Sequence, residues 1–160
     1  MDRDRITTIL TDPVTTELID SSPLMRFAYS APDGAARVVP LAYLLRDGLF
    51  VFCTIPASDK VAALRHDPRV AITIDRGQPL CCLLVRGTAE IELVEGVPDD
   101  YLEASRRNVP PEQWDGFEAQ VRAMYDSMVR VTVTPTWVRL NDFERTAPRA
   151  VERLMAERQS

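Results

Sequence analysis

A chain of 160 residues is the usual size of one domain, and its 46% apolar and 27% charged residues are typical of a globular protein with one hydrophobic core. The formal net charge is −5 at pH 7 and the sequence pI is about 4.9, so no overall field draws the chain towards nucleic acid or an anionic membrane. Any anion that it binds must therefore meet a local site.

No segment is typical of a secretion signal or a membrane span. The first ten residues are charged from Asp2 onward, and no later stretch is long and apolar enough to cross a bilayer, so we expect a cytoplasmic protein. Cys53, Cys81 and Cys82 lie in apolar runs without the spacing of metal ligands or of a disulfide framework, so we interpret them as reduced side chains. The single histidine, His66, excludes a multi-histidine metal site, and we expect no metal.

The first half of the chain predicts a short helix and then an antiparallel meander. Asp12 and Pro13 suit the N-cap and the first position of a helix over residues 13–19. Strands are expected at residues 24–30, 36–45 and 49–54. The pairs Asp33-Gly34 and Asp47-Gly48 separate these strands, and such pairs favour hairpins because both central residues of a type I′ turn need positive φ.

The second half returns to strands after one short helix. Helical spacing predicts a helix over residues 58–67, and strands follow at 70–75 and 80–93, with Gly87 as a bulge or a point of close approach. Further helices are expected at residues 99–108, from Pro110 or Pro111 onward, and at residues 147–158. A last strand, at residues 128–134 and 136–141, is expected to be interrupted by Pro135. This order lacks the regular strand-helix alternation of a parallel sheet. It predicts one mainly β (α+β) domain over residues 1–160, a six-stranded antiparallel barrel with peripheral helices, whose closure removes exposed edges.

One cluster of residues is suited to binding an anion. Ser58 is a candidate N-cap directly after a strand, so the backbone N–H groups and the positive end of the helix dipole point outward there. Lys60 adds a cation and Thr54 a hydroxyl, while Arg37, on a neighbouring strand, offers a bidentate contact. Each of these residues has an ordinary structural interpretation when taken singly, as a cap or a solvated side chain. Their combination in one hairpin and the following helix favours a phosphate site.

The same stretch resembles a known family. Three segments carry the resemblance: Arg37-Val-Val-Pro-Leu, then Thr54 with Ser58 and Lys60, then the helix ending Asp67-Pro-Arg-Val70. Together with Val85-Arg-Gly-Thr-Ala-Glu90, they are similar to the pyridoxamine-phosphate-oxidase-like flavoproteins over about residues 24–93. The resemblance implies a split β-barrel, a homodimer with a site built from both subunits, and a flavin phosphate held by Arg37, Thr54, Ser58 and Lys60. It also implies two-electron transfer at the cofactor ring.

The sequence departs from the pyridoxamine phosphate oxidases themselves at several positions. Ala42 replaces a lysine, Asp59 replaces an arginine, Cys82 replaces a glutamine, and the arginine-bearing C-terminal segment is not evident. We therefore do not expect vitamin B6 oxidation. The chain is more similar to the actinobacterial-type branch, in which FMN and the deazaflavin coenzyme F-420 both occur. FMN is favoured because a deazaflavin with an anionic polyglutamate tail would be helped by a basic groove, and Arg106-Arg107 is the one dense basic run.

The expected function is thus an FMN-dependent oxidoreductase that acts on a small molecule. A deazaflavin-dependent reductase is the first alternative, and a non-catalytic carrier of flavin or haem is the second, because no residue is evident as a general acid or base. A degenerate barrel that binds no cofactor is a third. A homodimer is also expected from the apolar helical faces at residues 117–128 and 151–155. Tyr43 and Trp137 are candidate pocket aromatics, although both also suit a core.

Overall fold

The computed structural model describes residues 1–145 and 149–159, without the side chains of Arg149 and Gln159. In chain order the elements are α1 (Arg3–Leu10), α2 (Pro13–Ser21), β1 (Leu24–Ser30), β2 (Ala36–Ala42), β3 (Leu44–Arg46), β4 (Leu49–Thr54), α3 (Asp59–His66), β5 (Arg69–Gly77), β6 (Leu80–Glu95), α4 (Asp99–Arg106), the 3-10 turn η1 (Pro111–Gln113), α5 (Trp114–Met124), β7 (Ser127–Asp142) and α6 (Arg149–Gln159).

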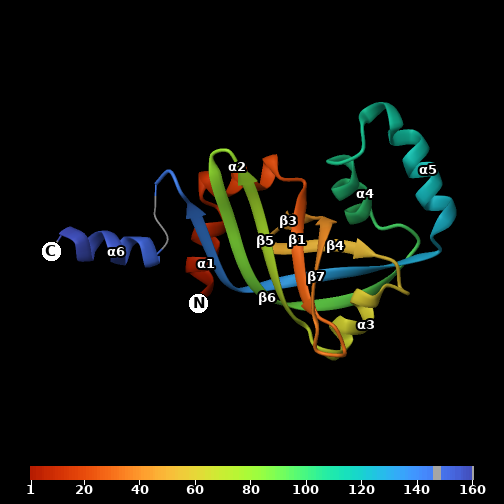
Figure 1. Cartoon of the computed structure of the whole chain (residues 1–160). Helices are drawn as coiled ribbons and strands as arrows, with labels where there is room; N and C mark the ends of the chain where they lie inside the picture. The colour runs from red at the N-terminus through yellow and green to blue at the C-terminus, as the bar shows by residue number, and fades with distance from the viewer. Residues whose placement is uncertain (146–148, 160) are drawn as a thin grey trace.

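The strands form one strongly curved antiparallel sheet with helices around it (Figure 1). The strand order is β2-β1-β5-β6-β7-β4-β3, so β2 and β3 are the two edges. These edges are not hydrogen-bonded to each other, and the sheet is therefore open rather than closed. The prediction of a mainly β, α+β fold is confirmed, while the prediction of full barrel closure is wrong.

The opening in the sheet is located at Tyr43. We expected one strand over residues 36–45, but Tyr43 separates β2 from β3, which stand at opposite edges of the sheet, and this raises the count from six strands to seven. Tyr43 is completely buried, and its hydroxyl donates to the carbonyl oxygen of Ser22 at 3.0 Å. Arg107 donates to the carbonyl oxygen of Tyr43 and lies over its ring. Tyr43 is thus held by contacts with residues outside the sheet, at the point where the chain passes from one edge strand to the other.

The two predicted hairpin turns differ in form. Asp47 and Gly48 both have positive φ, 53° and 77°, as the predicted type I′ turn between β3 and β4 requires. At the first turn only Gly34 has positive φ, and the loop between β1 and β2 is closed by hydrogen bonds between Ala31 and Ala35 and from Gly34 to Ala31. The Asp-Gly signal therefore located both hairpins but identified the turn type of only one.

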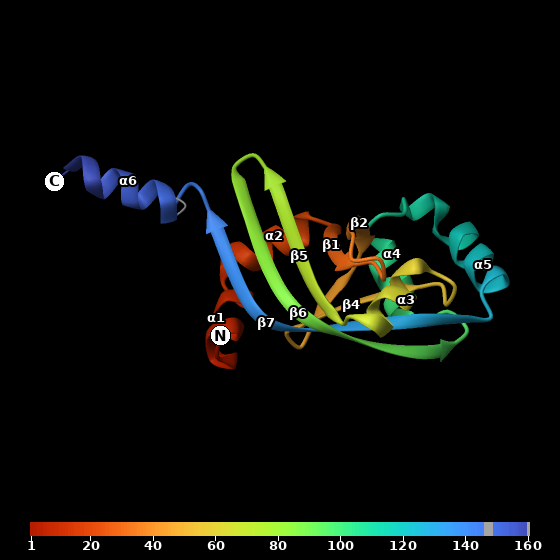
Figure 2. The same ribbon diagram turned by 60° about the horizontal axis from the view of Figure 1, so that its bottom comes forward.

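The longest strands, β6 and β7, pair along almost their full length and extend to the α5 side of the molecule (Figure 2). Their register shifts between Arg86 and Gly87, where Gly87 is opposite Pro135 and Arg86 is opposite Trp137. This irregularity lets β7 continue through Pro135, which we expected to interrupt it. A Cβ atom on Gly87 would lie 2.6 Å from the carbonyl oxygen of Thr134, so the predicted close approach is confirmed.

Two helices at the N-terminus cover the left of the sheet in Figure 1. The predicted α2 begins after its N-cap Asp12, whose carboxylate accepts from the Val14 N–H at 2.8 Å. We did not predict α1, which is capped by Asp2 and buries Ile6 and Leu10. Ile9 also packs against the core, so the apolar residues of α1 have helical spacing, a signal that our sequence analysis missed.

The hydrophobic side chains form two separate clusters. The larger one lies inside the curved sheet and includes Phe27, Phe50, Phe52, Ile72, Leu83 and Val131. The smaller one lies under α4 and α5 and consists of Val97, Leu102, Trp114, Val121 and Met128, with Tyr101 and Phe117 packed against it. The predicted helices at residues 99–108 and after Pro111 thus carry a core of their own.

The C-terminal helix is observed over Arg149–Gln159; residues 147 and 148 of the predicted helix lie outside the described part of the chain. Val151, Leu154 and Met155 are exposed on α6, at the spacing of one helical face. Across the described ranges, no helix has the length and hydropathy of a membrane-crossing segment.

Candidate functional site

The start of α3 has the local geometry of an anion site. Ser58 is the N-cap, as predicted, and its Oγ accepts from the Lys60 N–H at 3.4 Å. Val61, Ala63 and Leu64 are buried and fix the helix against the sheet, so its first turn is held with the positive end of its dipole facing outward. A hydroxyl that accepts one hydrogen bond still has a proton to donate, so the Ser58 side chain can contribute to an anion.

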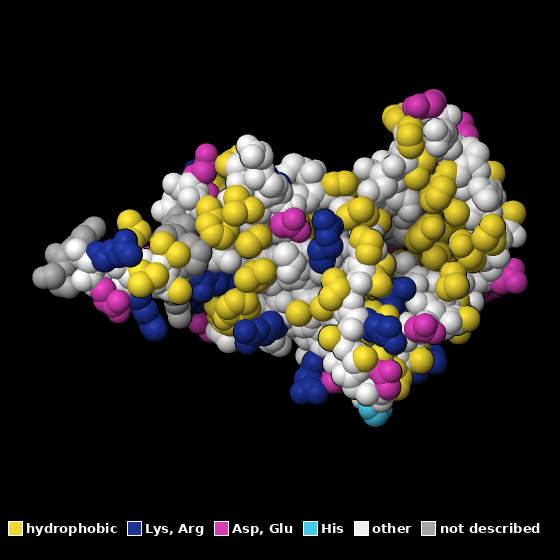
Figure 3. All heavy atoms as spheres, in the orientation of Figure 1, with side chains coloured by type: hydrophobic (Ala, Val, Ile, Leu, Met, Phe, Trp, Pro, Cys, Tyr) yellow, Lys and Arg dark blue, Asp and Glu magenta, His cyan; other side chains and the backbone are white. Residues whose placement is uncertain are grey.

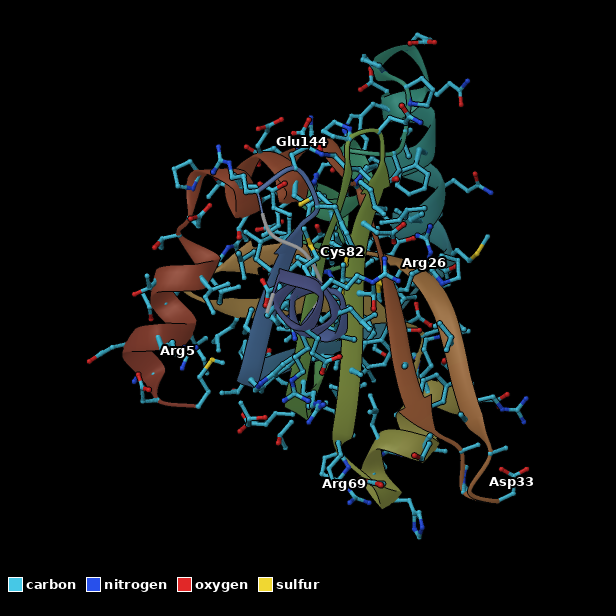
Figure 4. All side chains as sticks on the ribbon, turned by 60° about the vertical axis from the view of Figure 1, so that its left-hand side comes forward. Arg5, Arg26, Asp33, Arg69, Cys82 and Glu144 are labelled. Atoms are coloured by element: carbon cyan, nitrogen blue, oxygen red, sulfur yellow. The ribbon has the colours of Figure 1, made fainter. Side chains whose placement is uncertain are left out.

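Arg37 reaches the same helix from β2. It is exposed, stands opposite Tyr29 of β1, and lines a pocket of about 530 Å³ together with Asp59 of α3. Ala31, Pro32, Asp33, Val39 and Ala62 complete this pocket, which we call the anion pocket. Asp33 lies at the tip of the β1–β2 hairpin, and Arg69, just beyond α3, lies at the same end of the sheet (Figure 4). Arg37 and the first turn of α3 are therefore close, although they are 22 residues apart.

The other predicted site residues surround the start of α3 without lining that pocket. Thr54 is the last residue of β4, opposite Val129, and is half-buried, as are Ser58 and Lys60. Among the described residues that line the anion pocket, only Arg37 belongs to the predicted set. The structure thus places Arg37 and Asp59 on one pocket, with Ser58 and Lys60 on either side of Asp59 in the chain and Thr54 at the end of β4.

Two of the predicted site residues, Arg37 and Lys60, are cations. In the part of the chain that the structure describes, neither Arg37 nor Lys60 makes a side-chain hydrogen bond or an ion pair. Arg69, by contrast, is paired with Asp67 through two hydrogen bonds of 2.9 and 2.7 Å. Two free cations, two hydroxyls and a helix N-terminus form a donor set that fits a phosphate group. Asp33 and Asp59, which both line the pocket, oppose an anion.

A second pocket lies nearer the other end of β2. It has a volume of about 460 Å³ and is lined by Leu24, Pro40, Leu41, Ala42, Cys53, Tyr101, Ala104, Ser105, Asn108, Val109 and Phe117. We call it the apolar chamber. Arg37 and Val39 line the anion pocket, and the next three residues of the strand, Pro40, Leu41 and Ala42, line the chamber. The two cavities are therefore neighbours on one edge of the open sheet.

The helical wall of the chamber is held by a cluster of charges outside it. Asp100 of α4 is nearly buried, and its two oxygens accept from Arg46 at 2.6 Å and from Arg130 at 2.7 Å. Arg46 also pairs with Glu103, and Arg130 with Glu92. Because Arg46 belongs to β3 and Arg130 to β7, this cluster fixes α4 to two strands of the sheet.

Neither titratable group in the chamber is poised to ionise near neutral pH. Burial raises the pKa of the Cys53 thiol to about 12, and burial also raises the pKa of the Tyr101 phenol. Cys53 is therefore a neutral thiol rather than a nucleophile. Cys53, Cys81 and Cys82 are all free, as the sequence analysis expected. His66 is exposed on α3, and in the described residues no group of three His, Cys, Asp or Glu side chains is placed to hold a metal ion.

The chamber was not found from the sequence. We expected the stripe of α5 that contains Phe117 to be core or dimer contact, and we expected Tyr43 and Trp137 as the pocket aromatics. Instead Tyr43 is completely buried, Trp137 lies under Arg86 at 4.7 Å, and neither residue lines the chamber. One sequence feature did point to the chamber: Ala42, which replaces a lysine of the pyridoxamine phosphate oxidases, lines it.

The chain belongs to the pyridoxamine 5'-phosphate oxidase family, whose model matches residues 11–142. This match spans the whole sheet and both cavities. Among curated protein sequences, none matches this chain.

Solved structures share the fold at low sequence identity. Protein Rv2991 of Mycobacterium tuberculosis is 23% identical, with a TM-score of 0.63 over 82% of this chain and 84% of that one. An F-420 reductase is 19% identical, with a TM-score of 0.59 over 77% of this chain and 94% of that one. HutZ, a haem storage protein of Vibrio cholerae, is 12% identical, with a TM-score of 0.58 over 80% of this chain and 92% of that one. These similarities establish a common fold. The cofactor and the reaction must be inferred from the residues of the site.

Proposed function

We propose that the protein is an FMN-dependent oxidoreductase, and that Arg37, Thr54, Ser58 and Lys60 hold the phosphate of the flavin. The observation that carries this proposal is the pairing of two cavities on β2: one lined by Arg37, which has no partner among the described residues, beside the N-terminus of α3, and one with an apolar, uncharged lining. The first cavity suits the phosphate of a flavin mononucleotide, whose ring would extend along β2 towards the second cavity and meet a substrate there.

The distance between the two cavities suits a long ligand. Arg37 and Ala42 are five residues apart on one strand, which corresponds to about 17 Å at the rise of an extended chain. A simple inorganic anion would need only the first turn of α3. A ligand with a phosphate, a flexible linker and a ring, anchored by its phosphate at Arg37, would extend from the anion pocket along this edge towards the chamber.

The residues contribute binding and orientation. Arg37 offers a planar pair of donors and Lys60 a point charge, while the Thr54 and Ser58 hydroxyls donate to the remaining phosphate oxygens. A bound flavin supplies two-electron transfer, and the protein determines where its ring meets the substrate. Among the residues that the structure describes, no carboxylate or imidazole lines the chamber, so the proposed mechanism assigns no protein group as a general acid or base.

Coenzyme F-420 is the second candidate, supported by the structural similarity to an F-420 reductase. The same phosphate site would serve it, and an anionic tail would then extend from the anion pocket. Storage of haem, the function in the name of HutZ, is less supported by the residues of this chain. Haem iron is usually held by His, thiolate, Met or phenolate. His66 is outside both cavities, and burial raises the pKa values of Cys53 and Tyr101.

We further propose a cytoplasmic homodimer whose small-molecule site is completed by the second subunit. Val38 on β2 is 64% exposed and Leu93 on β6 is 68% exposed, and α6 presents another apolar face. Exposed apolar surface of this kind favours association. Light scattering should give twice the chain mass of 18.0 kDa at micromolar concentration. A monomer that nevertheless binds FMN would remove the second subunit from the proposal.

The cofactor assignment is tested most directly at Lys60, which is the only lysine in the sequence. Lys60→Ala should weaken FMN binding about ten- to a hundredfold, because a charge-assisted contact contributes roughly 1.5 to 3 kcal/mol. Arg37→Ala should behave similarly. Arg65→Ala is the matched control, since it removes an exposed cation from the last turn of the same helix and should leave FMN affinity unchanged.

The measurement is a fluorescence titration with FMN, repeated with F-420 and with haem by absorbance. Reductive methylation offers an independent readout, because only Lys60 and the N-terminus carry amines, and bound FMN should protect Lys60. Unchanged FMN affinity in both Lys60→Ala and Arg37→Ala would remove the phosphate site from this proposal. Tight binding of F-420 with no binding of FMN would favour the second candidate.

A further inference from the structure

The apolar chamber has a lining that restricts what can enter it. None of its eleven lining residues is charged. The polar side chains among them largely bond to the protein itself: Ser105 Oγ donates to the Tyr101 carbonyl oxygen at 2.7 Å, and Asn108 Nδ2 donates to the Ala104 carbonyl oxygen at 3.3 Å. The Cys53 thiol stays neutral, since burial raises its pKa to about 12. A charged group moved from water into this lining would lose hydration without gaining a partner.

Two aromatic rings line the chamber. The rings of Tyr101 and Phe117 are nearly parallel, with an angle of 16° between them and centroids 6.3 Å apart. Pro40, Leu41 and Ala42 of the edge strand line the chamber together with these rings. Hydrophobic atoms gather over the α4–α5 lobe on the right of Figure 3, where the helical wall of the chamber reaches the surface. Aromatic walls of this kind favour stacking with a planar ring.

The walls are fixed before any ligand arrives. Asp100 joins α4 to Arg46 of β3 and to Arg130 of β7, so the helical wall keeps its place relative to the strands. A preformed cavity of about 460 Å³ lies within the range of sites that bind small organic ligands.

We propose that the chamber is the substrate site and that it receives a neutral, flat, hydrophobic ring compound rather than a phosphorylated or otherwise charged metabolite. This assignment rests on the proposed function, in that the chamber adjoins the anion pocket along β2 and so lies next to a cofactor anchored there. The proposal separates the chemistry of the two cavities: the anion pocket accounts for the charge of the cofactor, and the chamber accepts a substrate without charge.

A pair of dyes with similar rings and different charge tests the proposal. N-phenyl-1-naphthylamine is neutral and becomes fluorescent in apolar surroundings, while 8-anilinonaphthalene-1-sulfonate carries a sulfonate. Titration of the whole chain should show binding of the neutral dye at least about tenfold tighter than that of the sulfonate. Equal binding, or tighter binding of the sulfonate, would overturn the inference about charge.

Two variants locate the dye in the chamber. Val109→Asp places a carboxylate in the lining, and Ala42→Trp fills the cavity from the edge strand without adding charge; each should weaken binding of the neutral dye by about tenfold or more. The matched control is Val151→Asp, which makes the same change on the exposed face of α6 and should leave the affinity within about twofold. Thermal melts show whether each variant folds, and Ala42→Trp still decides the question if Val109→Asp does not. Unchanged binding in a folded Ala42→Trp protein would place the dye elsewhere and overturn the proposal.

The same titration in Lys60→Ala separates this inference from the proposed function. Dye binding that persists while FMN binding is lost supports two distinct cavities, as proposed. If the wild-type chain binds the dye in the chamber but binds neither FMN nor F-420, the proposed function fails and the assignment of the chamber to a substrate fails with it. If FMN binds and the neutral dye does not, the chamber inference alone is overturned.

Discussion

Arg37 of β2 and Asp59 of α3 line the same pocket, although one carries the charge that a phosphate needs and the other the charge that it avoids. Both side chains are exposed, and Asp59 occupies the first turn of α3, where a carboxylate complements the helix dipole. The aspartate thus stabilises the helix while it weakens the field that an anion would meet.

Asp59→Asn should therefore separate these two effects. FMN affinity should rise about two- to fivefold, because a nearby negative charge is removed in a partly screened setting. The free energy of unfolding without ligand should fall by about 0.3 to 1 kcal/mol, because the first turn of α3 loses its acidic residue. FMN titration and thermal melting of the same preparations measure both. Asp67→Asn is a poor control because Asp67 pairs with Arg69, whereas Asp47→Asn lies at a distant turn and should leave FMN affinity unchanged.

Asp100 should be the most sensitive of the acidic residues for stability. Its side chain is 10% exposed and serves both Arg46 and Arg130, so Asp100→Asn leaves two guanidinium groups less compensated. We expect the free energy of unfolding to fall by about 2 to 4 kcal/mol, as when one partner of a buried pair is removed. Glu103→Gln, which breaks only the exposed pair with Arg46, should cost less than about 1 kcal/mol. Similar losses in the two variants, measured by urea unfolding, would contradict the role given to Asp100.

Tyr43 should make the fold sensitive to alkali. Burial raises its pKa from 10.0 to about 12, so the folded state favours the neutral phenol. A folded-state pKa above the unfolded value gives stabilisation that is fully present below pH 10 and is lost as the pH rises through 12. Two pKa units correspond to about 2 to 3 kcal/mol. Cys53, whose pKa burial raises from 9.0 to about 12, should contribute a loss that begins near pH 9.

Tyr43→Phe tests this dependence. At pH 7 the variant should lose about 1 kcal/mol, because the hydrogen bond to the Ser22 carbonyl oxygen is removed. Between pH 10 and 12, however, its stability should fall less steeply than that of the wild type. Urea titrations at pH 8, 10 and 11.5 measure the difference, and parallel pH profiles for the two proteins would refute the assignment to Tyr43.

Gly87 should not tolerate a side chain. A Cβ atom there would lie 2.6 Å from the Thr134 carbonyl oxygen and 2.7 Å from Val133 Cγ1, and both belong to the neighbouring strand. Gly87→Ala should therefore cost about 1 to 3 kcal/mol, through forced movement of β7. Gly77→Ala is the matched control on the same sheet, since a Cβ atom there meets nothing within 4 Å. Its effect should stay within about 0.5 kcal/mol. Differential scanning calorimetry would show both.

Most of the sheet followed from local patterns in the sequence. β1 and β4 begin and end as predicted, because alternation and turn signals act over a few residues. The division at Tyr43 could not be predicted in this way. It depends on Ser22 and Arg107, which are distant in sequence and meet Tyr43 only in the folded chain. The same reason applies to Pro135, whose place in β7 depends on a register shift opposite Gly87.

The site was predictable in its composition and not in its arrangement. Ser58 and its helix could be identified from cap chemistry, and Arg37 from its family motif, because both signals are local. That Asp59 would share a pocket with Arg37 depends on how α3 turns against β1 and β6, which the periodicity of eight residues does not specify. The apolar chamber required the position of α4, which is set by Asp100 and two arginines from other strands.

Met128 and Val129 are neighbours on β7, and they belong to different hydrophobic clusters, one under α4 and α5 and one inside the curved sheet. Since successive residues of a strand face opposite ways, this single segment of β7 contributes side chains to both hydrophobic clusters. Fraying of β7 would expose the two cores together, so the lobe should not melt as an independent subdomain. Amides of α5 and of the central sheet should then exchange with solvent through one common opening event, and a ligand bound in either cavity should slow hydrogen exchange in both.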